Sequence, residues 1–158
     1  MLKRAHRAMQ HRLADAWAQR AEGTPLKSED EALVLASIVE KETGLPSDRG
    51  LVAGVFNNRL RLGMPLQTDP SVIYGLGASF DGNLRKRDLQ TDGPYNTYLR
   101  VGLPPTPIAM PGKASLLAAV QPADTKALFF VSRGDGSSVF SETLAEHNRA
   151  VDKYQRGR

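Results

Sequence analysis

The chain has 158 residues, which is about the size of one domain, so two full domains are not expected. Hydrophobic residues make up 41% and charged residues 24%, and this composition excludes a wholly disordered, collagen-like or coiled-coil chain. The net charge of +4 comes entirely from residues 1–20, which hold five basic groups and one acidic group. Because the excess charge is confined to this short segment, we do not expect nucleic acid as a partner.

The first helix is predicted over residues 2–20, where apolar side chains recur at spacings of three and four. Gly23 and Pro25 end it. We expect this basic helix to dock on the rest of the domain through Met9 and Trp17.

A second helix is predicted over residues 28–43. Ser28 followed by Glu31 is typical of a capping box at a helix start, and Gly44 and Pro46 provide the stop. Its apolar positions predict a helix buried along one face.

A third helix is predicted to begin after Ser47 or Asp48 and to end at Gly63. We expect a buried apolar face and a polar face, the latter carrying Asn57, Asn58, Arg59 and Arg61.

Residues 64–111 are rich in turn signals, and a long irregular stretch in a small domain is typical of a functional region. Within it, Asp69 is predicted to be the N-cap of a short helix over 70–76, with Pro70 at the first helical position.

The last part of the chain predicts a helix over 113–120, a β-hairpin from 127–133 and 138–141, and a closing helix that begins between 141 and 143 and runs towards Tyr154. Helices predominate and strands are few, so the predicted fold class is α+β with a small sheet.

Several kinds of chemistry lack the residues they need. No run of apolar residues predicts a membrane span or a secretory signal, and without cysteine there is no disulfide scaffold, thiol nucleophile or Cys-ligated zinc. The chain has no nucleophile elbow and no phosphate-binding loop. His147 lies beside Glu146 in a predicted helix, so the two point to different faces, and we interpret this as a solvated helix surface. We therefore expect no metal ion and no cofactor.

Two glutamates near the end of the 28–43 helix differ in the face they occupy. At about 100° per residue, Glu42 falls about 40° from Ile38, in the middle of the apolar face, whereas Glu40 falls about 200° away. Burial and the negative end of the helix dipole should both raise the pKa of a carboxyl group at the position of Glu42, which would make it a general acid. The alternative is that Glu42 bends out or pairs with Arg59 or Arg61.

The sequence of the same helix, Leu35-Ala-Ser-Ile-Val-Glu-Lys-Glu-Thr43, resembles the catalytic helix of the YceG-like endolytic murein transglycosylases, also called MltG. Further blocks resemble the family in the same order over roughly residues 30–150, among them Val55-Phe56-Asn-Asn-Arg59-Leu60, Leu66-Gln67-Thr68-Asp69-Pro70, Tyr95-Asn96-Thr97-Tyr98 and Gly102-Leu103-Pro104-Pro105.

The resemblance implies a lysozyme-like catalytic domain with a single essential glutamate, which corresponds to Glu42. It implies cleavage of the β-1,4 bond between N-acetylmuramic acid and N-acetylglucosamine within glycan strands, leaving 1,6-anhydromuramyl ends. One carboxyl group is enough if it acts first as acid and then as base. A hydrolytic muramidase is the alternative that would use Asp69 as a second carboxylate, and a glycan-binding or scaffold module without turnover is another.

Supporting roles follow from the same resemblance. Substrate binding is expected from Gln67, Thr68, Asp69, Tyr95, Asn96, Tyr98 and Glu40, by amide, hydroxyl and aromatic groups suited to sugars. For five of them a structural or solvent-exposed role is the alternative: loop-to-backbone bonding for Gln67 and Thr68, the N-cap for Asp69, core packing for Tyr98, and solvent for Glu40. Arg59 could neutralise the carboxylate of Glu42 or form a surface ion pair.

The expected organisation is an N-terminal basic helix or module junction at 1–25 and a catalytic domain at 26–158. Family members usually carry a membrane anchor and a LysM-like module before this domain, and this chain shows neither. We therefore expect a parent protein anchored in the bacterial inner membrane, with this domain on the outer side acting on peptidoglycan glycan strands. Peptidoglycan synthases are the expected protein partners.

Overall fold

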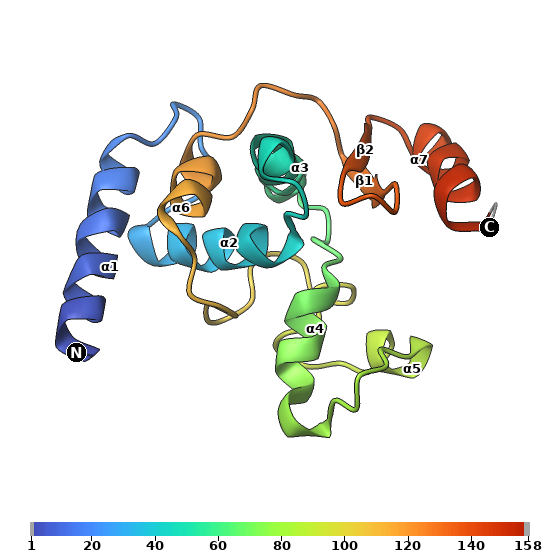
Figure 1. The fold of residues 1–158 in the computed structure, drawn as a ribbon, viewed down its shortest axis with the longest axis horizontal. Coiled ribbons are helices and arrows are strands. Elements are labelled where there is room, and N and C mark those ends of the chain that lie inside the picture. Colours follow the sequence, from blue (N-terminus) through green and yellow to red (C-terminus); the bar gives the residue numbers. More distant parts are fainter. Residues whose placement is uncertain (1, 157–158) are drawn as a thin grey trace.

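The computed structural model describes residues 2–156, which form seven α-helices and one two-stranded sheet. The predicted α+β class is confirmed. Figure 1 shows an elongated arrangement with α1 at one end, α7 at the other, and the remaining helices between them. The helices are α1 (Leu2–Ala18), α2 (Glu29–Glu42), α3 (Arg49–Leu62), α4 (Asp69–Leu76), α5 (Lys86–Leu89), α6 (Lys113–Val120) and α7 (Leu144–Val151). The strands are β1 (Phe129–Ser132) and β2 (Ser138–Ser141), and short helical turns occupy Pro46–Asp48, Gly77–Ser79 and Asp152–Arg156.

The core forms where α2 crosses α3 and α6 (Figure 1). Side chains from all three helices are fully or almost fully buried there, and each large one contributes roughly 1.5–3 kcal/mol through its removal from water. They include Leu35, Ile38 and Val39 of α2, Val52 and Phe56 of α3, and Leu116 and Val120 of α6. This burial fixes the position of the C-terminal end of α2.

The two ends of α2 follow from local chemistry. Ser28 is the N-cap and its hydroxyl accepts a hydrogen bond from Glu31 N at 3.2 Å, as predicted. The carboxylate of Glu31 accepts from Lys27 N at 2.9 Å rather than from Ser28, so only half of the predicted capping box forms. At the other end, Thr43 is extended and its hydroxyl donates to Val39 O at 2.7 Å, which leaves Glu42 as the last helical residue.

Helix α1 packs against α2 and α6. Its buried residues are Leu13 and Ala16, and Met9 and Trp17 pack against the core as predicted. Among the described residues, no helix combines the length and apolar character that a membrane crossing needs.

The polar face predicted for α3 is only partly solvated. Asn57 is 1% exposed and Arg59 5% exposed. The end of α6 and the segment between α6 and β1 pass over this face, and their backbone carbonyls accept from it. Asn57 Nδ2 donates to Ala119 O of α6 at 3.1 Å, and Asn58 Nδ2 donates to Thr125 O and Ala127 O of the following segment, each at 2.9 Å.

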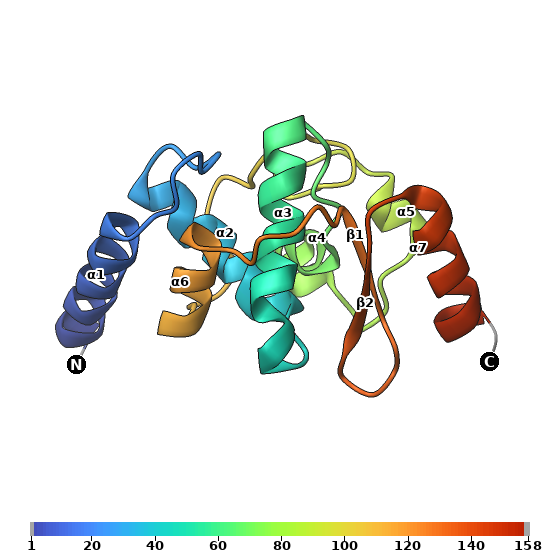
Figure 2. The ribbon, with the colours of Figure 1, turned by 90° about the horizontal axis from the view of Figure 1, so that it is seen from above.

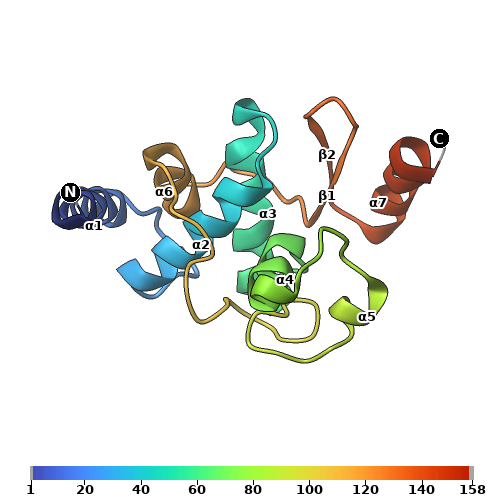
Figure 3. The same ribbon diagram turned by 60° about the horizontal axis from the view of Figure 1, so that its bottom comes forward.

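The hairpin packs beside α3, and α7 packs on the side of the hairpin that faces away from α3 (Figure 2). Strands β1 and β2 pair antiparallel with Phe130 opposite Phe140, and Phe130 meets Phe56 of α3 edge to face at 5.8 Å between ring centroids. Thr143 caps α7 by accepting from Glu146 N at 3.2 Å. Figure 3 shows α4 and the loop with α5, which the sequence did not predict, below the hairpin and α7.

Candidate active site

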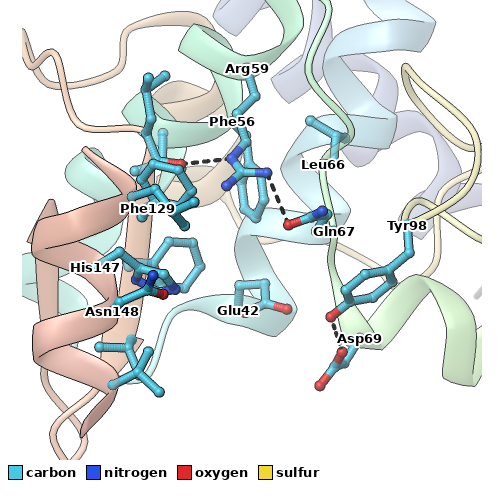
Figure 4. A pocket seen from close by; sticks show the side chains of 16 residues that line it. Glu42, Phe56, Arg59, Leu66, Gln67, Asp69, Tyr98, Phe129, His147 and Asn148 are labelled. Atoms are coloured by element: carbon cyan, nitrogen blue, oxygen red, sulfur yellow. Dashed lines mark hydrogen bonds between the residues drawn. The ribbon is translucent and has the colours of Figure 1, made fainter. Parts of the chain in front are cut away.

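An open cleft of about 490 Å³ lies between the hairpin with α7 and the segment that leads into α4. Six segments of the chain contribute to it: the end of α2, the buried face of α3, the turn before α4, the loop that carries Tyr98, and β1 and α7, which together form one wall. Among the lining residues are Glu42, Arg59, Gln67, Asp69, Tyr98, Phe129, His147 and Asn148, all shown in Figure 4.

Glu42 lies in this cleft because it is the last residue of α2 and belongs to the apolar face that the core orients. Its Oε1 accepts a hydrogen bond from Thr68 Oγ1 at 2.8 Å. Burial raises the pKa of Glu42 above the ordinary 4.5, the nearby charge of Asp69 raises it further, and the bond from Thr68 opposes both. The predicted direction of the pKa shift is thus confirmed.

The alternative partners of Glu42 are engaged elsewhere. Arg61 donates to Asn58 Oδ1 and Gly23 O, and Arg59 donates to backbone carbonyls and to Gln67. Within residues 2–156 neither arginine forms an ion pair with Glu42. Glu42 therefore points into the cleft with a hydroxyl partner and no cationic one.

Thr68 is held in place by a buried set of hydroxyl groups. Its backbone N–H donates to Thr97 Oγ1 at 2.9 Å, and Ser71 Oγ lies 3.0 Å from Thr97 Oγ1 and 2.8 Å from Tyr95 O. Thr68, Ser71 and Thr97 are each at most 1% exposed. This set joins α4 to the 95–98 loop behind Glu42.

Gln67 adopts a left-handed backbone with φ of 52°, which is rare outside glycine and costs roughly 1 kcal/mol or more. Its backbone N–H donates to Thr97 O at 3.1 Å, and its side-chain Oε1 accepts from Arg59 Nη1 at 3.5 Å, at the limit of a hydrogen bond. The strained backbone turns the amide of Gln67 into the cleft, where Figure 4 shows it beside Arg59 and above Glu42.

The prediction that Asp69 caps α4 is wrong. The N-cap is Thr68, with Asp69 already the first helical residue, and the carboxylate of Asp69 instead accepts a hydrogen bond from the hydroxyl of Tyr98. This long-range partner replaces the local cap. Burial and the contact with Asp69 both raise the pKa of Tyr98, so its hydroxyl stays protonated and remains a donor.

The opposite wall of the cleft was not predicted as part of a site. The interpretation of His147 as a solvated surface residue is wrong: its ring stacks on Phe129 at 5.0 Å and lines the cleft. Its Nδ1 is buried and has no hydrogen-bond partner among the described residues, and burial together with the charge of Arg59 lowers its pKa. Leu144, His147 and Val151 form one stripe of α7, a spacing that already implied a packing partner for this helix face.

Comparisons with known proteins decide the family. The model of the YceG-like family matches residues 1–153. The chain belongs to the YceG-like family.

Two relatives and one solved structure illustrate this similarity. An endolytic murein transglycosylase of Bacillus subtilis is 48% identical over 122 residues, covering 77% of this chain and 34% of the relative. One from Streptococcus pneumoniae is 33% identical over 130 residues, covering 79% of this chain and 24% of the relative. A crystal structure of a YceG-like protein from Listeria monocytogenes superposes with a TM-score of 0.70 at 43% identity, covering 77% of this chain and 39% of that one. The chain thus spans about a third or less of the length of these curated relatives.

Three residues predicted to bind substrate lie outside the cleft of this YceG-like chain. Glu40 accepts hydrogen bonds from Gly112 N at 2.7 Å and Ser115 Oγ at 3.2 Å, so its carboxylate satisfies the N-terminal end of α6. Tyr95 bonds through its hydroxyl to Thr106 at 2.8 Å.

Asn96 is the third predicted substrate-binding residue that lies outside the cleft. It is 4% exposed, and its side chain forms hydrogen bonds with the backbone of its own loop. Its Nδ2 donates to the carbonyls of Leu89 at 3.0 Å and Thr91 at 2.8 Å, while its Oδ1 accepts from the backbone N–H groups of Tyr98 and Leu99. Among the predicted residues, the structure therefore brings Glu42, Gln67, Thr68, Asp69 and Tyr98 together.

Proposed function

We propose that this domain is the catalytic part of an endolytic peptidoglycan lytic transglycosylase. The reaction is cleavage of the β-1,4 bond between N-acetylmuramic acid and N-acetylglucosamine within glycan strands, which leaves 1,6-anhydromuramyl ends. The observation that carries the proposal is Glu42, a carboxyl group with a raised pKa at the floor of an open cleft. The names of the Bacillus and Streptococcus relatives support the same activity.

The proposed mechanism needs one carboxyl group. Protonated Glu42 gives its proton to the glycosidic oxygen as the bond between that oxygen and C1 breaks. The C6 hydroxyl oxygen of the same muramyl sugar then attacks C1, and its proton passes to the carboxylate of Glu42. The acid is regenerated and no water is consumed.

The surroundings of Glu42 suit both halves of this cycle. Burial favours the protonated acid before bond cleavage, and the hydroxyl of Thr68 supports the carboxylate that follows by donating to Oε1. Gln67 and Tyr98 present polar groups to the same space, and Leu144 and Val151 are among the apolar side chains that line the opposite wall. A cleft with polar groups on one side and apolar groups on the other matches the two kinds of surface that a sugar ring exposes.

A hydrolytic muramidase is the second candidate function, because Asp69 lines the same cleft as Glu42. In a hydrolase, the second carboxylate activates water or attacks the sugar. The bond from Tyr98 to Asp69 stabilises the carboxylate but also occupies one of its oxygens.

Mass spectrometry of the muropeptides released from purified peptidoglycan tests both candidates. We expect anhydro ends, whereas exclusively reducing ends, heavier by one water molecule, would support the hydrolase. A Glu42→Gln variant should lose activity by several orders of magnitude. Its matched control is Glu40→Gln on the same helix, which should keep most activity because Glu40 contacts α6 and not the cleft. Saturable glycan binding without any product from the unmodified protein would indicate a binding module instead.

For the full-length protein we propose an inner-membrane anchor, an extracytoplasmic catalytic domain, and peptidoglycan synthases as partners. A murein substrate requires the domain to act outside the cytoplasm. Fractionation of cells and cross-linking of the full-length protein test this arrangement, and recovery in the cytosolic fraction would contradict it.

A further inference from the structure

Arg59 is a buried cation at the cleft. Its residue exposure is 5%, and it comes from the last turn of α3. Figure 4 shows its guanidinium pointing into the space that Gln67 and Glu42 also face. A charge removed from water in this way is costly unless other groups compensate it.

The hydrogen bonds of Arg59 compensate only part of this cost. Its Nε donates to Leu128 O at 2.7 Å, and its Nη1 donates to Pro65 O at 2.7 Å and weakly to Gln67 Oε1 at 3.5 Å. All three acceptors are neutral, and Nη2 makes no hydrogen bond within residues 2–156. The guanidinium also lies over the ring of Phe129, with Cζ 5.0 Å from the centroid. These contacts fix the plane of the guanidinium and leave one amino group free.

The two carboxyl groups of the cleft do not neutralise Arg59. Glu42 is bonded by Thr68 and has a raised pKa, and Asp69 is bonded by Tyr98. Within the described part of the chain, Arg59 forms no ion pair with either. The positive charge of Arg59 acts on His147, where it adds to the effect of burial in lowering the pKa of the imidazole.

We propose that Arg59 binds a carboxylate of the glycan substrate, in the cleft beside Glu42. The inference rests on the proposed function. The sugar backbone of peptidoglycan is uncharged, so the carboxylate has two sources: the lactyl group of a muramyl residue that has lost its peptide, or the stem peptide itself. A charge-assisted bond from a guanidinium of fixed orientation would select strands that carry such a group.

Turnover of three kinds of glycan strand tests the proposal with the unmodified protein. One kind carries stem peptides with free carboxylates, the second has lost its peptides and exposes lactyl carboxylates, and the third carries peptides whose carboxylates are all amidated. We expect kcat/KM to be about tenfold to a hundredfold lower for the amidated strands than for the better of the other two, mainly through KM. Which of the first two is better identifies the source of the carboxylate. Equal turnover of all three overturns the proposal.

Variants of Arg59 then show whether this residue reads the carboxylate. Arg59→Gln should abolish the preference, and Arg59→Lys, which keeps the charge, should retain part of it. Arg61→Gln is the matched control, because Arg61 is exposed on the same helix and bonds Asn58 and Gly23 outside the cleft. A folded Arg59→Gln variant that keeps the full preference overturns the proposal.

A binding measurement separates this inference from the proposed activity. The imidazole of His147 is followed by NMR, with its signal assigned by a His147→Gln variant, while N-acetylmuramic acid or a muramyl dipeptide is added. A carboxylate on Arg59 should raise the pKa of His147 by offsetting the positive charge, and N-acetylglucosamine, which has no carboxylate, should not. This result would support the inference even if no strand were cleaved. Identical responses to the acidic and neutral sugars would overturn it even if the enzyme were active.

Discussion

The hydroxyl of Thr68 donates a hydrogen bond to Glu42 Oε1 at 2.8 Å and thereby connects the N-cap of α4 to the last residue of α2. A threonine at an N-cap commonly accepts from a backbone N–H of its own helix, but Thr68 makes no such bond. Its hydroxyl is used on Glu42 instead. The orientation of the proposed acid therefore depends on how α4 and the 95–98 loop are assembled.

Replacing Thr68 by valine should lower kcat/KM about tenfold, the equivalent of one hydrogen bond, because the carboxyl group of Glu42 loses the group that orients it. The bond also stabilises the ionised form, so the pKa of Glu42 should rise further and the alkaline limb of the pH–rate profile should move to higher pH. Thr68→Ser keeps the hydroxyl and should keep the profile. An unchanged alkaline limb in Thr68→Val would contradict this role.

Replacing Asp69 by asparagine should shift the same limb in the opposite direction. The negative charge of Asp69 raises the pKa of Glu42, so its removal should lower that pKa and bring the alkaline limb to lower pH. If Asp69 only tunes Glu42, the products of Asp69→Asn remain anhydro ends at a reduced rate. Loss of all turnover in a folded Asp69→Asn variant would assign Asp69 a direct part in bond cleavage.

The stability of the protein should depend on pH through Glu42. Burial raises the pKa of Glu42 in the folded state above that of the unfolded chain, so the folded state holds the proton more tightly and stability falls as pH rises through the window between the two values. Glu42→Gln removes this penalty and should be more stable than the parent at neutral pH, by about 1.4 kcal/mol for each unit of pKa difference.

The two proteins should unfold at similar denaturant concentrations below the ordinary carboxyl pKa of 4.5, where Glu42 is protonated in both states. Urea denaturation of the parent and of Glu42→Gln at neutral pH and at a pH below 4.5 gives the free energies of unfolding to compare. Glu40→Gln is the control and should gain no stability at neutral pH, since it weakens a bond to the N-terminal end of α6. A Glu42→Gln variant less stable than the parent at neutral pH would argue against a buried acid with a raised pKa.

Asn96 should prove structural rather than substrate-binding. Asn96→Ala leaves four backbone groups of its loop without their buried side-chain partner and should lower the free energy of unfolding by roughly 2–4 kcal/mol. Tyr95→Phe loses only an exposed bond to Thr106 and should change it by less than about 1 kcal/mol. Thermal unfolding of both variants distinguishes the roles, and weakened glycan binding at full stability in Asn96→Ala would restore the sugar-binding interpretation.

Two glycines of α3 should respond differently to the same substitution. A Cβ at Gly54 would lie 2.6 Å from Thr125 Cγ2 and 3.3 Å from Ala123 O, whereas at Gly50 it would lie 3.4 Å from Ala123 Cβ. Gly54→Ala should therefore destabilise the protein by about 1–3 kcal/mol despite the better helix propensity of alanine, and Gly50→Ala should stay within about 0.5 kcal/mol. Because residues 123–128 lead into β1, Gly54→Ala should also reduce turnover. Equal unfolding midpoints for the two variants would refute this close packing.

Several features of the protein could be predicted from local sequence alone. The helix around Ile38 follows from apolar spacing, Ser28 and Gly63 mark helix ends by caps that involve residues within a few positions, and the hairpin follows from its turn. The face of Glu42 depends only on the helical repeat, so its partial burial could be predicted without any knowledge of what covers it.

The remainder of the site was decided by contacts between distant segments. The local sequence allowed a surface position for Arg59, but Leu128, 69 positions away, supplies a backbone carbonyl that accepts from its guanidinium. The local sequence predicted Asp69 as an N-cap, but its carboxylate accepts a hydrogen bond from Tyr98, 29 positions away. The hydroxyl of Thr68 donates to Glu42. Local sequence determines the secondary structure and the face on which each polar side chain lies, because these depend on backbone geometry and neighbouring side chains. Tertiary packing determines which hydrogen-bond partner each side chain has, since a hydrogen bond or an ion pair forms only between groups that are close in space.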